Sequence, residues 1–481
     1  MSICSFRWFI FVLIFTDIAY SFCQHFHIAL DGDMAAIILP AEWYHRVLED
    51  PFGFSAIFQG EKYGAPNRFF VHWFMGFYFK NIPALLQHFV SPIDSVYLAC
   101  ALLKTAIQVL IGWMLAAYIS GTANLSRREF LLAAVLILPL FQNADYRGTM
   151  GVIEGSITYT CFYALPMGLL LLFFFPFFRA IRSGSDLQLS FLQKIMLACL
   201  AVVLAFNGPL VPPVVLITCL LILFYFGFQY FRKNGEPSSP LSWIAYAGNL
   251  PKQLLAYLLI FSILCLYSLW LGTYNVENDA ATVPVLERYT RLPLGMFNQF
   301  SLRLGLPLLL ALVLVNAVFL KKLKSEEAAR MLKILKWVGL FCLLFILLLP
   351  LGGYRDYRPN IIRRDTLLPV LLCLMFCFGL TSSFLLRELP QRFRKFFAGG
   401  IVFVLVFYTA ADVNPRLFDH NRCQRAALEQ LATSPEKVVH LSTDCTVLTW
   451  TPVTNERDSE LYGRLLLHWG VTKEMKYFYQ K

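Results

Sequence analysis

The chain has 481 residues, of which 58% are hydrophobic and only 15% are charged. Soluble domains carry roughly 25% charged residues, so this composition, with a mean hydropathy of +0.60, excludes an ordinary soluble protein. The formal charge of +11 does not indicate nucleic-acid binding, because excess Lys and Arg in a membrane protein gather in cytoplasmic loops and set its orientation.

Eleven segments are predicted to cross the membrane, because each approaches the roughly 20 mostly apolar residues that a transmembrane helix needs. Their ranges are 5–23, 94–119, 128–143, 157–179, 190–206, 209–231, 253–272, 300–320, 335–351, 367–386 and 397–412. The alternative for the first segment is a cleaved signal peptide. Only Arg7 lies in its n-region and no small-residue cleavage site follows, so we favour an uncleaved span. We therefore expect an all-α polytopic membrane domain over residues 1–412 and a small external region over residues 413–481.

Basic residues predict which loops face the cytoplasm. One alternating set of loops is rich in Lys and Arg, at 127–128, 179–194, 232–233, 321–336 and 387–395. We therefore expect a cytoplasmic N-terminus, a long external loop at 24–93 and an external C-terminus. The predicted external loops hold no glycosylation sequon, which favours a bacterial cell inner membrane as the location.

The first external loop begins with the triplet DGD at 31–33, just past the first span. In extended backbone, residues i and i+2 share a face, so Asp31 and Asp33 are able to present two carboxylates together. Such a pair would bind a divalent metal ion, or one carboxylate would act as general base on an acceptor hydroxyl. The alternative is structural: Asp33 is the N-cap of the following helix, and Gly32 makes the turn.

Two further external loops contain polar residues of interest. The loop at 142–155 supplies Asp145, Arg147 and Glu154 as candidates for the same site, although an ordinary loop fits this sequence as well. The loop at 275–293 is expected to be either a mobile lid or a solvated connector.

Two charged residues lie inside predicted spans, Asp17 in the first and Lys104 in the second. Intramembrane charges are costly and are usually paired or functional. Counting inward from the external edge places both at comparable depth, so we predict that Asp17 and Lys104 approach each other as an ion pair.

The C-terminal region has a soluble-like composition. Residues 424–434 and 459–470 are predicted to be helices and residues 437–444 a strand, which together would make a small α/β cap over the external mouth. If the cap lies outside the cytoplasm, Cys423 and Cys445 would be able to form a disulfide.

This layout resembles the GT-C-fold integral-membrane glycosyltransferases, including protein O-mannosyltransferases and lipid A aminoarabinose transferases. The resemblance lies in a first span, an acidic pair, a long external loop, many spans and an external C-terminal region. It implies transfer of a sugar from a polyprenyl-phosphate donor to an extracytoplasmic acceptor, which is a cell-envelope glycan, a lipid or a protein. By position, Asp31 and Asp33 match the family's catalytic or metal-binding carboxylate. Many relatives have adjacent acids, so DGD leaves open which aspartate acts and whether a divalent metal ion is used.

The resemblance also gives a role to the external loop GGYRDYRPNIIRRD at 352–365, whose charge departs from the positive-inside rule. Guanidinium groups bind phosphate oxygens bidentately and keep their charge when desolvated. The donor phosphate would therefore be held by residues of this loop: Arg355, Arg358, Arg363, Arg364, Tyr354 and Tyr357. The alternative is that the arginines pair with Asp356 and Asp365, or with anionic headgroups of membrane lipid.

Two other functions stay open at this stage. An envelope-glycan polymerase or ligase also needs external arginines for a lipid pyrophosphate but does not need the acidic pair. A non-enzymatic lipid or solute transporter needs a continuous polar path through the spans, and few polar residues besides Asp17 and Lys104 lie there.

Overall fold

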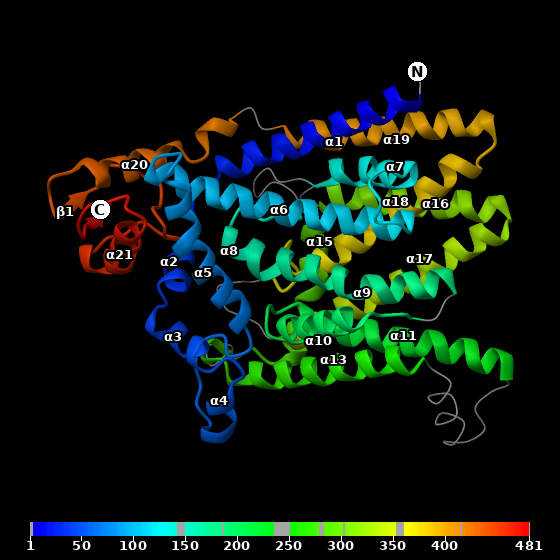
Figure 1. Cartoon of the computed structure of the whole chain (residues 1–481), viewed down its shortest axis with the longest axis horizontal. Helices are drawn as coiled ribbons and strands as arrows, with labels where there is room; N and C mark the ends of the chain where they lie inside the picture. Colours follow the sequence, from blue (N-terminus) through cyan, green and yellow to red (C-terminus); the bar gives the residue numbers. More distant parts are fainter. Residues whose placement is uncertain are drawn as a thin grey trace.

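A computed structural model describes residues 3–141, 150–184, 187–234, 251–278, 283–301, 304–352, 360–413 and 416–480. The protein is mostly helical, and within these residues nine helices are long and apolar enough to cross a membrane. They belong to α1 (Ile3–Phe26), α6 (Pro92–Ser120), α8 to α9 (Ile157–Tyr159, Leu165–Ser183), α11 (Val211–Asn234), α13 (Lys252–Leu271), α16 (Gly305–Leu323), α17 (Glu326–Leu348), α18 (Leu368–Glu388) and α19 (Gln391–Asp412). These helices lie side by side in one bundle, as expected for a multi-pass membrane protein (Figure 1).

Two of the eleven predicted spans are shorter helices. Residues 190–206 form α10 (Phe191–Ala205), whose 15 residues are joined to α11 by a tight turn at Asn207 and Gly208. Residues 128–143 begin as α7 (Arg128–Ile137) and continue into the 3-10 turn η1 (Leu138–Leu140), where Pro139 prevents a regular helix from continuing. Since α7 packs between α6, α18 and α1, its apolar residues are covered by neighbouring helices.

The first loop, residues 24–93, folds into four helices at one end of the bundle: α2 (Met34–Ile38), α3 (Glu42–Glu49), α4 (Phe54–Gln59) and α5 (Phe69–Leu86). Figure 1 shows α5 lying across the ends of the long helices, whereas the N-terminus and the turns joining α16 to α17 and α18 to α19 lie at the opposite end.

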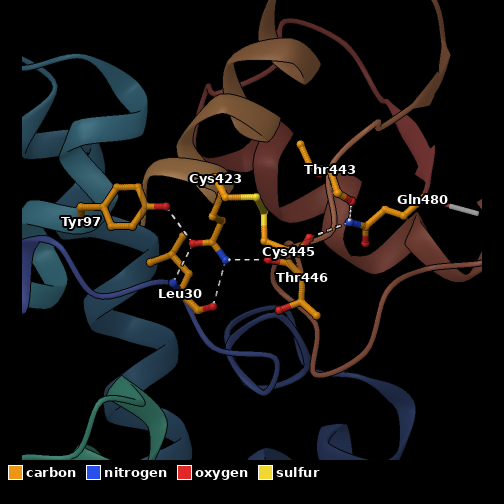
Figure 2. The surroundings of a disulfide bond; sticks show 8 residues. Leu30, Tyr97, Cys423, Thr443, Cys445, Thr446 and Gln480 are labelled. Atoms are coloured by element: carbon orange, nitrogen blue, oxygen red, sulfur yellow. Dashed lines mark hydrogen bonds between the residues drawn. A yellow bond between two sulfur atoms is a disulfide. The ribbon is translucent and has the colours of Figure 1, made fainter. Parts of the chain in front are cut away.

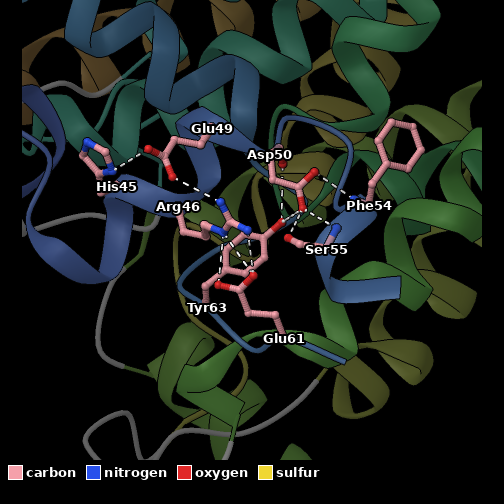
Figure 3. A network of polar contacts seen from close by, with 8 residues as sticks. All are labelled: His45, Arg46, Glu49, Asp50, Phe54, Ser55, Glu61 and Tyr63. Atoms are coloured by element: carbon pink, nitrogen blue, oxygen red, sulfur yellow. Dashed lines mark hydrogen bonds and ion pairs between the residues drawn. The ribbon is translucent and has the colours of Figure 1, made fainter. Parts of the chain in front are cut away.

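A network of polar contacts fixes the turn between α3 and α4 (Figure 3). The Asp50 carboxylate accepts hydrogen bonds from the backbone N–H groups of Phe54 and Ser55, both at 2.8 Å, and from the Tyr63 hydroxyl at 3.1 Å. Burial alone would raise the pKa of Asp50, but the bonds from Ser55, Phe54 and Tyr63 outweigh it and hold the pKa below its ordinary value. Asp50 therefore stays ionised and stabilises this turn near neutral pH.

The segment that follows α13 is bonded to this loop. The residues that follow α13 form η4 (Gly272–Tyr274) and η5 (Val276–Asn278), and further on lie α14 (Val285–Thr290), α15 (Leu292–Ser301) and η6 (Leu349–Gly352). The Ala65 N–H donates to Asn275 Oδ1 at 3.2 Å, and the Val276 N–H donates to Tyr63 O at 3.2 Å. The start of the predicted lid at 275–293 is therefore bonded to the first loop.

The C-terminal cap is a small α/β unit made of η7 (Leu417–Asp419), α20 (Arg422–Thr433), β1 (Val438–His440), η8 (Glu456–Ser459), α21 (Glu460–His468) and β2 (Tyr477–Tyr479). β1 and β2 pair in parallel, with Val439 opposite Phe478. The predicted helices and strand are confirmed, and β2 is an addition that the sequence did not suggest. The disulfide between Cys423 and Cys445 is present, as expected if the cap is extracytoplasmic (Figure 2).

The cap is bonded to the first span, to α6 and to the first loop. The Gln424 side chain donates to Leu30 O at 3.1 Å and accepts from the Leu30 N–H and the Tyr97 hydroxyl, both at 2.7 Å. Arg425 pairs with Asp94 at 2.6 Å and lies over the Tyr97 ring, 4.2 Å from its centroid. These contacts hold the cap beside the residues that lead into DGD (Figure 2).

Candidate functional site

Asp31 is buried and its carboxylate is fully hydrogen-bonded. Oδ1 accepts from the Thr158 hydroxyl at 2.9 Å and from the Asp33 N–H at 3.0 Å. Oδ2 accepts from the Ser156 hydroxyl at 2.8 Å and from the Thr158 N–H at 3.0 Å. A carboxylate offers about four lone-pair positions, and four donors occupy them here. Asp31 therefore anchors the first loop to the start of α8, a structural role.

The same short segment, residues 154–158, also binds a buried lysine. Lys104 of α6 donates its ammonium to the carbonyl of Gly155, and the Asp31 carboxylate lies within electrostatic range of this ammonium. Lys104 is almost completely buried, so its charge is stabilised by these oxygens rather than by water.

The predicted ion pair between Asp17 and Lys104 is wrong. α1 and α6 run antiparallel, and Gln108 contacts both Ser21 and His25. This register places Lys104 near the level of His25, about eight residues from Asp17, which corresponds to about 12 Å along the helix axis. Asp17 lies instead within electrostatic range of Asp412 in α19. Counting from the loop ends failed because the two helices do not end at the same level: α6 begins at Pro92 and extends about eleven residues beyond the level of Phe26, where α1 ends.

Two of the predicted arginines form ion pairs with neighbouring acids. Arg364 pairs with Glu154, so the structure does bring together one residue predicted for phosphate binding and one predicted for the same site. Arg363 pairs with Asp365 at 2.6 Å, which is the alternative considered for this loop. Both guanidinium groups are thereby neutralised by carboxylates of the protein.

The remaining predicted residues of these loops, Asp145, Arg147, Tyr354, Arg355, Tyr357 and Arg358, lie outside the described residues.

Asp33 differs from Asp31 in its surroundings. It is half-buried and occupies the N-cap position of α2, but its side chain makes no capping hydrogen bond. Instead, Asp33 Oδ1 accepts from the indole N–H of Trp450 in the cap at 2.8 Å. A Cβ atom added to Gly32 would lie 2.5 Å from the Trp450 backbone nitrogen, so only glycine allows the cap to come this close.

The sequence interpretation missed a basic and aromatic group around the start of α5. Arg68, at the N-cap of α5, lies 6.0 Å from the Phe162 ring centroid, and its buried Nε has no hydrogen-bond partner among the described residues. His72 lies one turn further along the same face of α5 and contacts the rings of Tyr44 and Phe162 at 4.8 and 5.3 Å. The i, i+4 spacing in RFFVH was the one signal in the sequence that could have suggested this pair.

Electrostatics tie this group to Asp33. Burial and the nearby Arg68 guanidinium lower the pKa of His72 to about 3, so the imidazole is neutral at physiological pH. Burial raises the pKa of Tyr44, and Glu277, Arg68 and Asp33 all act on its hydroxyl. The Tyr44 hydroxyl, which donates to Glu277 at 3.2 Å, therefore lies within electrostatic range of both the Arg68 cation and the Asp33 carboxylate.

A divalent metal ion does not fit the acidic pair. All four lone-pair positions of Asp31 accept hydrogen bonds from the protein, so a metal ion would have to displace these donors. Within the described residues, no cluster of three or more His, Cys, Asp or Glu side chains is placed to hold a metal ion. We therefore derive no chemistry through a metal.

Comparisons with known proteins leave the family open. No protein-family model, no curated protein and no solved structure matches this chain.

Proposed function

We propose that this protein transfers a sugar from a polyprenyl-phosphate donor to an acceptor on the extracytoplasmic face of the membrane. The observation that supports it best is that a half-buried carboxylate, Asp33, and an arginine whose buried Nε has no hydrogen-bond partner among the described residues, Arg68, both lie within electrostatic range of the Tyr44 hydroxyl at one end of a membrane bundle. A glycosyl transfer of this kind needs a base for the acceptor hydroxyl and a cation for the departing phosphate.

The orientation proposed for the chain rests on the cap. Disulfides persist in oxidising compartments and are rare in the cytosol. The Cys423–Cys445 disulfide therefore supports an extracytoplasmic cap, and the first loop, which is bonded to the cap through Gln424 and Trp450, lies on the same side. The N-terminus of α1 would then be cytoplasmic, in agreement with the distribution of basic loops.

Of the two aspartates, Asp33 is the one suited to act as base. Every lone-pair position of Asp31 is occupied by a protein donor, so Asp31 has no oxygen to offer an acceptor hydroxyl. Asp33 would accept the hydroxyl proton as the acceptor oxygen bonds to the anomeric carbon. The bond from the anomeric carbon to the phosphate oxygen breaks at the same time, and the polyprenyl phosphate leaves with the electron pair.

Arg68 is suited to the departing phosphate because its Nε has no hydrogen-bond partner within the described part of the chain, so this donor is available without first breaking an ion pair. Arg363 and Arg364 would have to exchange Asp365 and Glu154 for the phosphate. In this proposal Arg364 therefore holds the 360–367 loop against the 154–158 segment, and Arg363 stabilises that loop internally through Asp365.

The test is a mass-spectrometric comparison of lipid-linked and surface glycans in cells. The strains carry wild type, a deletion, Asp33→Asn, Arg68→Met or, as the matched control, Arg46→Met, in which an arginine of α3 that pairs with Glu61 at 2.9 Å is replaced. We expect the deletion, Asp33→Asn and Arg68→Met to lose the same sugar while Arg46→Met retains it. A deletion that changes glycans while Asp33→Asn behaves as wild type would refute the transferase chemistry and favour a polymerase, ligase or transporter.

A further inference from the structure

The cap presents an aromatic surface directly beside Asp33. The Trp450 side chain is 49% exposed, although its indole N–H is held by the Asp33 carboxylate. The ring of Tyr159 lies 6.1 Å from the Trp450 ring at 34°, and Tyr163 follows one turn later, 5.9 Å from Tyr159. Trp450, Tyr159 and Tyr163 therefore form a continuous aromatic row, which we call the aromatic row below.

The aromatic row comes from two parts of the chain that are each firmly fixed. The Tyr159 N–H donates to Ser156 Oγ at 3.1 Å, and Ser156 in turn bonds to Asp31. On the cap side, Val447 and Leu448 are fully buried, and the backbone of Thr449 and Trp450 rests against Gly32. Fixing an aromatic ring before the ligand arrives reduces the entropy that binding would otherwise cost.

We infer that the aromatic row, together with Asp33, is a binding surface for a pyranose ring. One face of a pyranose is made of C–H groups, which pack on aromatic faces, and its rim carries hydroxyls, which donate to a carboxylate. Ligand sites combine apolar and aromatic surface with a few fixed polar groups in this manner. The inference rests on the proposed function in one respect only: the pyranose would be a sugar of the donor or of the acceptor.

An exposed tryptophan in a membrane protein also occurs as an anchor in the lipid interface. Such an anchor directs its N–H toward headgroups or water. The Trp450 N–H is instead bonded to a carboxylate of the first loop, close to Tyr462, whose hydroxyl is also within electrostatic range of Asp33. Trp270 of α13 offers the contrast, because it is similarly exposed, at 47%, and its ring lies against those of Tyr267 and Tyr274.

The test uses the full chain in lipid nanodiscs and saturation-transfer NMR, with methyl glycosides of common hexopyranoses as probes and glycerol as the polyol without a ring. We expect saturation of the C–H protons of one pyranose face and none of glycerol. Trp450→Ala should weaken binding roughly three- to tenfold, the range expected for loss of one aromatic contact, and Trp450→Phe should weaken it less. Trp270→Ala should bind as wild type does.

The inference is overturned if wild type saturates no glycoside, or if Trp450→Ala and Trp270→Ala bind equally well. Unfolding is excluded as the cause of weaker glycoside binding when Trp450→Phe and Trp450→Ala retain the Cys423–Cys445 disulfide and the wild-type melting temperature.

A second pair of probes distinguishes the donor sugar from the acceptor sugar. A hexose 1-phosphate that binds more tightly than its methyl glycoside, and loses this advantage in Arg68→Met, would identify the donor. Equal binding of the two probes in both proteins would identify the acceptor. Both outcomes support the pyranose surface.

Failure of this inference is separable from failure of the proposed function. If the deletion removes a sugar from cellular glycans but Trp450→Ala leaves binding unchanged, the transferase proposal stands and the aromatic row is structural. If glycosides bind through Trp450 but the deletion leaves all glycans unchanged, the protein binds sugars without transferring them.

Discussion

Replacing Asp31 with Asn should destabilise the protein far more than the same change at Asp33. An asparagine side chain keeps one acceptor oxygen and replaces the other with an NH₂ group. Two of the four donors on Asp31 would then face a donor, and the segment 154–158 would lose one or two of its three bonds to Asp31, depending on which oxygen is replaced. A hydrogen bond to a charged group contributes roughly 1.5–3 kcal/mol, so the loss of two such bonds should cost about 3–6 kcal/mol, and about half of that if the Ser156 hydroxyl rotates to accept from the new NH₂ group.

The buried free cysteines provide the assay for this prediction. Cys100 and Cys161 are buried and unpaired, so a thiol-reactive fluorophore labels them only as the fold opens on heating. Asp31→Asn should melt several degrees below wild type in this assay. Asp33→Asn should melt close to wild type, because the amide oxygen still accepts from the Trp450 indole and the site is only half-buried. Equal melting temperatures for the two variants would refute the assignment of Asp31 as the anchor of the first loop.

Three further changes test the packing around the site. Gly32→Ala should dislodge the backbone at Trp450 and lower the melting temperature, whereas Gly339→Ala, where an added Cβ meets nothing within 4 Å, should not. Arg425→Met should destabilise the docking of the cap by about 2–3 kcal/mol, because the ion pair with Asp94 and the contact with the Tyr97 ring are lost. Proteolysis of the C-terminal region should then be faster, and an unchanged cleavage rate would contradict this role. The folded state lowers the pKa of His72 to about 3. Between about pH 6.5 and pH 3, the His72 imidazole is therefore protonated in the unfolded chain but not in the folded protein. The free energy of unfolding of the wild type should therefore fall by roughly 1.4 kcal/mol for each pH unit between about pH 6 and pH 3, and that of His72→Leu should fall less over the same interval. An identical pH dependence of the two melting temperatures would argue against a buried neutral imidazole.

The membrane-spanning architecture was predictable because it depends on local composition. Runs of about 20 apolar residues identify spans without knowledge of their neighbours, and nine of them agree with long helices. The shorter helices show where this reasoning stops. α7 is covered by α6, α18 and α1, so its length is set by packing and by Pro139 rather than by the thickness of a bilayer.

The elements of the cap were also largely predictable, since helical periodicity and strand composition are local patterns. The pairing of Cys423 with Cys445 follows from their being the two cysteines of that region. β2 was missed because KYFYQK is too short to show alternation, and its pairing with β1 depends on contacts nearly 40 residues away.

Sequence alone also pointed to DGD as the acidic motif of the first loop, but it was not able to separate the two aspartates. They are two residues apart and chemically identical. What separates them is contact with remote parts of the chain: Ser156 and Thr158 lie more than 120 residues from Asp31, and Trp450 lies 417 residues from Asp33. The same holds for Arg68, whose buried, unpartnered Nε is visible only after α5 packs against Phe162. Local pattern thus determined which segments are helices and which loops carry charge. Tertiary packing decided which carboxylates and guanidinium groups are hydrogen-bonded or ion-paired within the protein, because hydrogen bonding and burial are properties of neighbours in space.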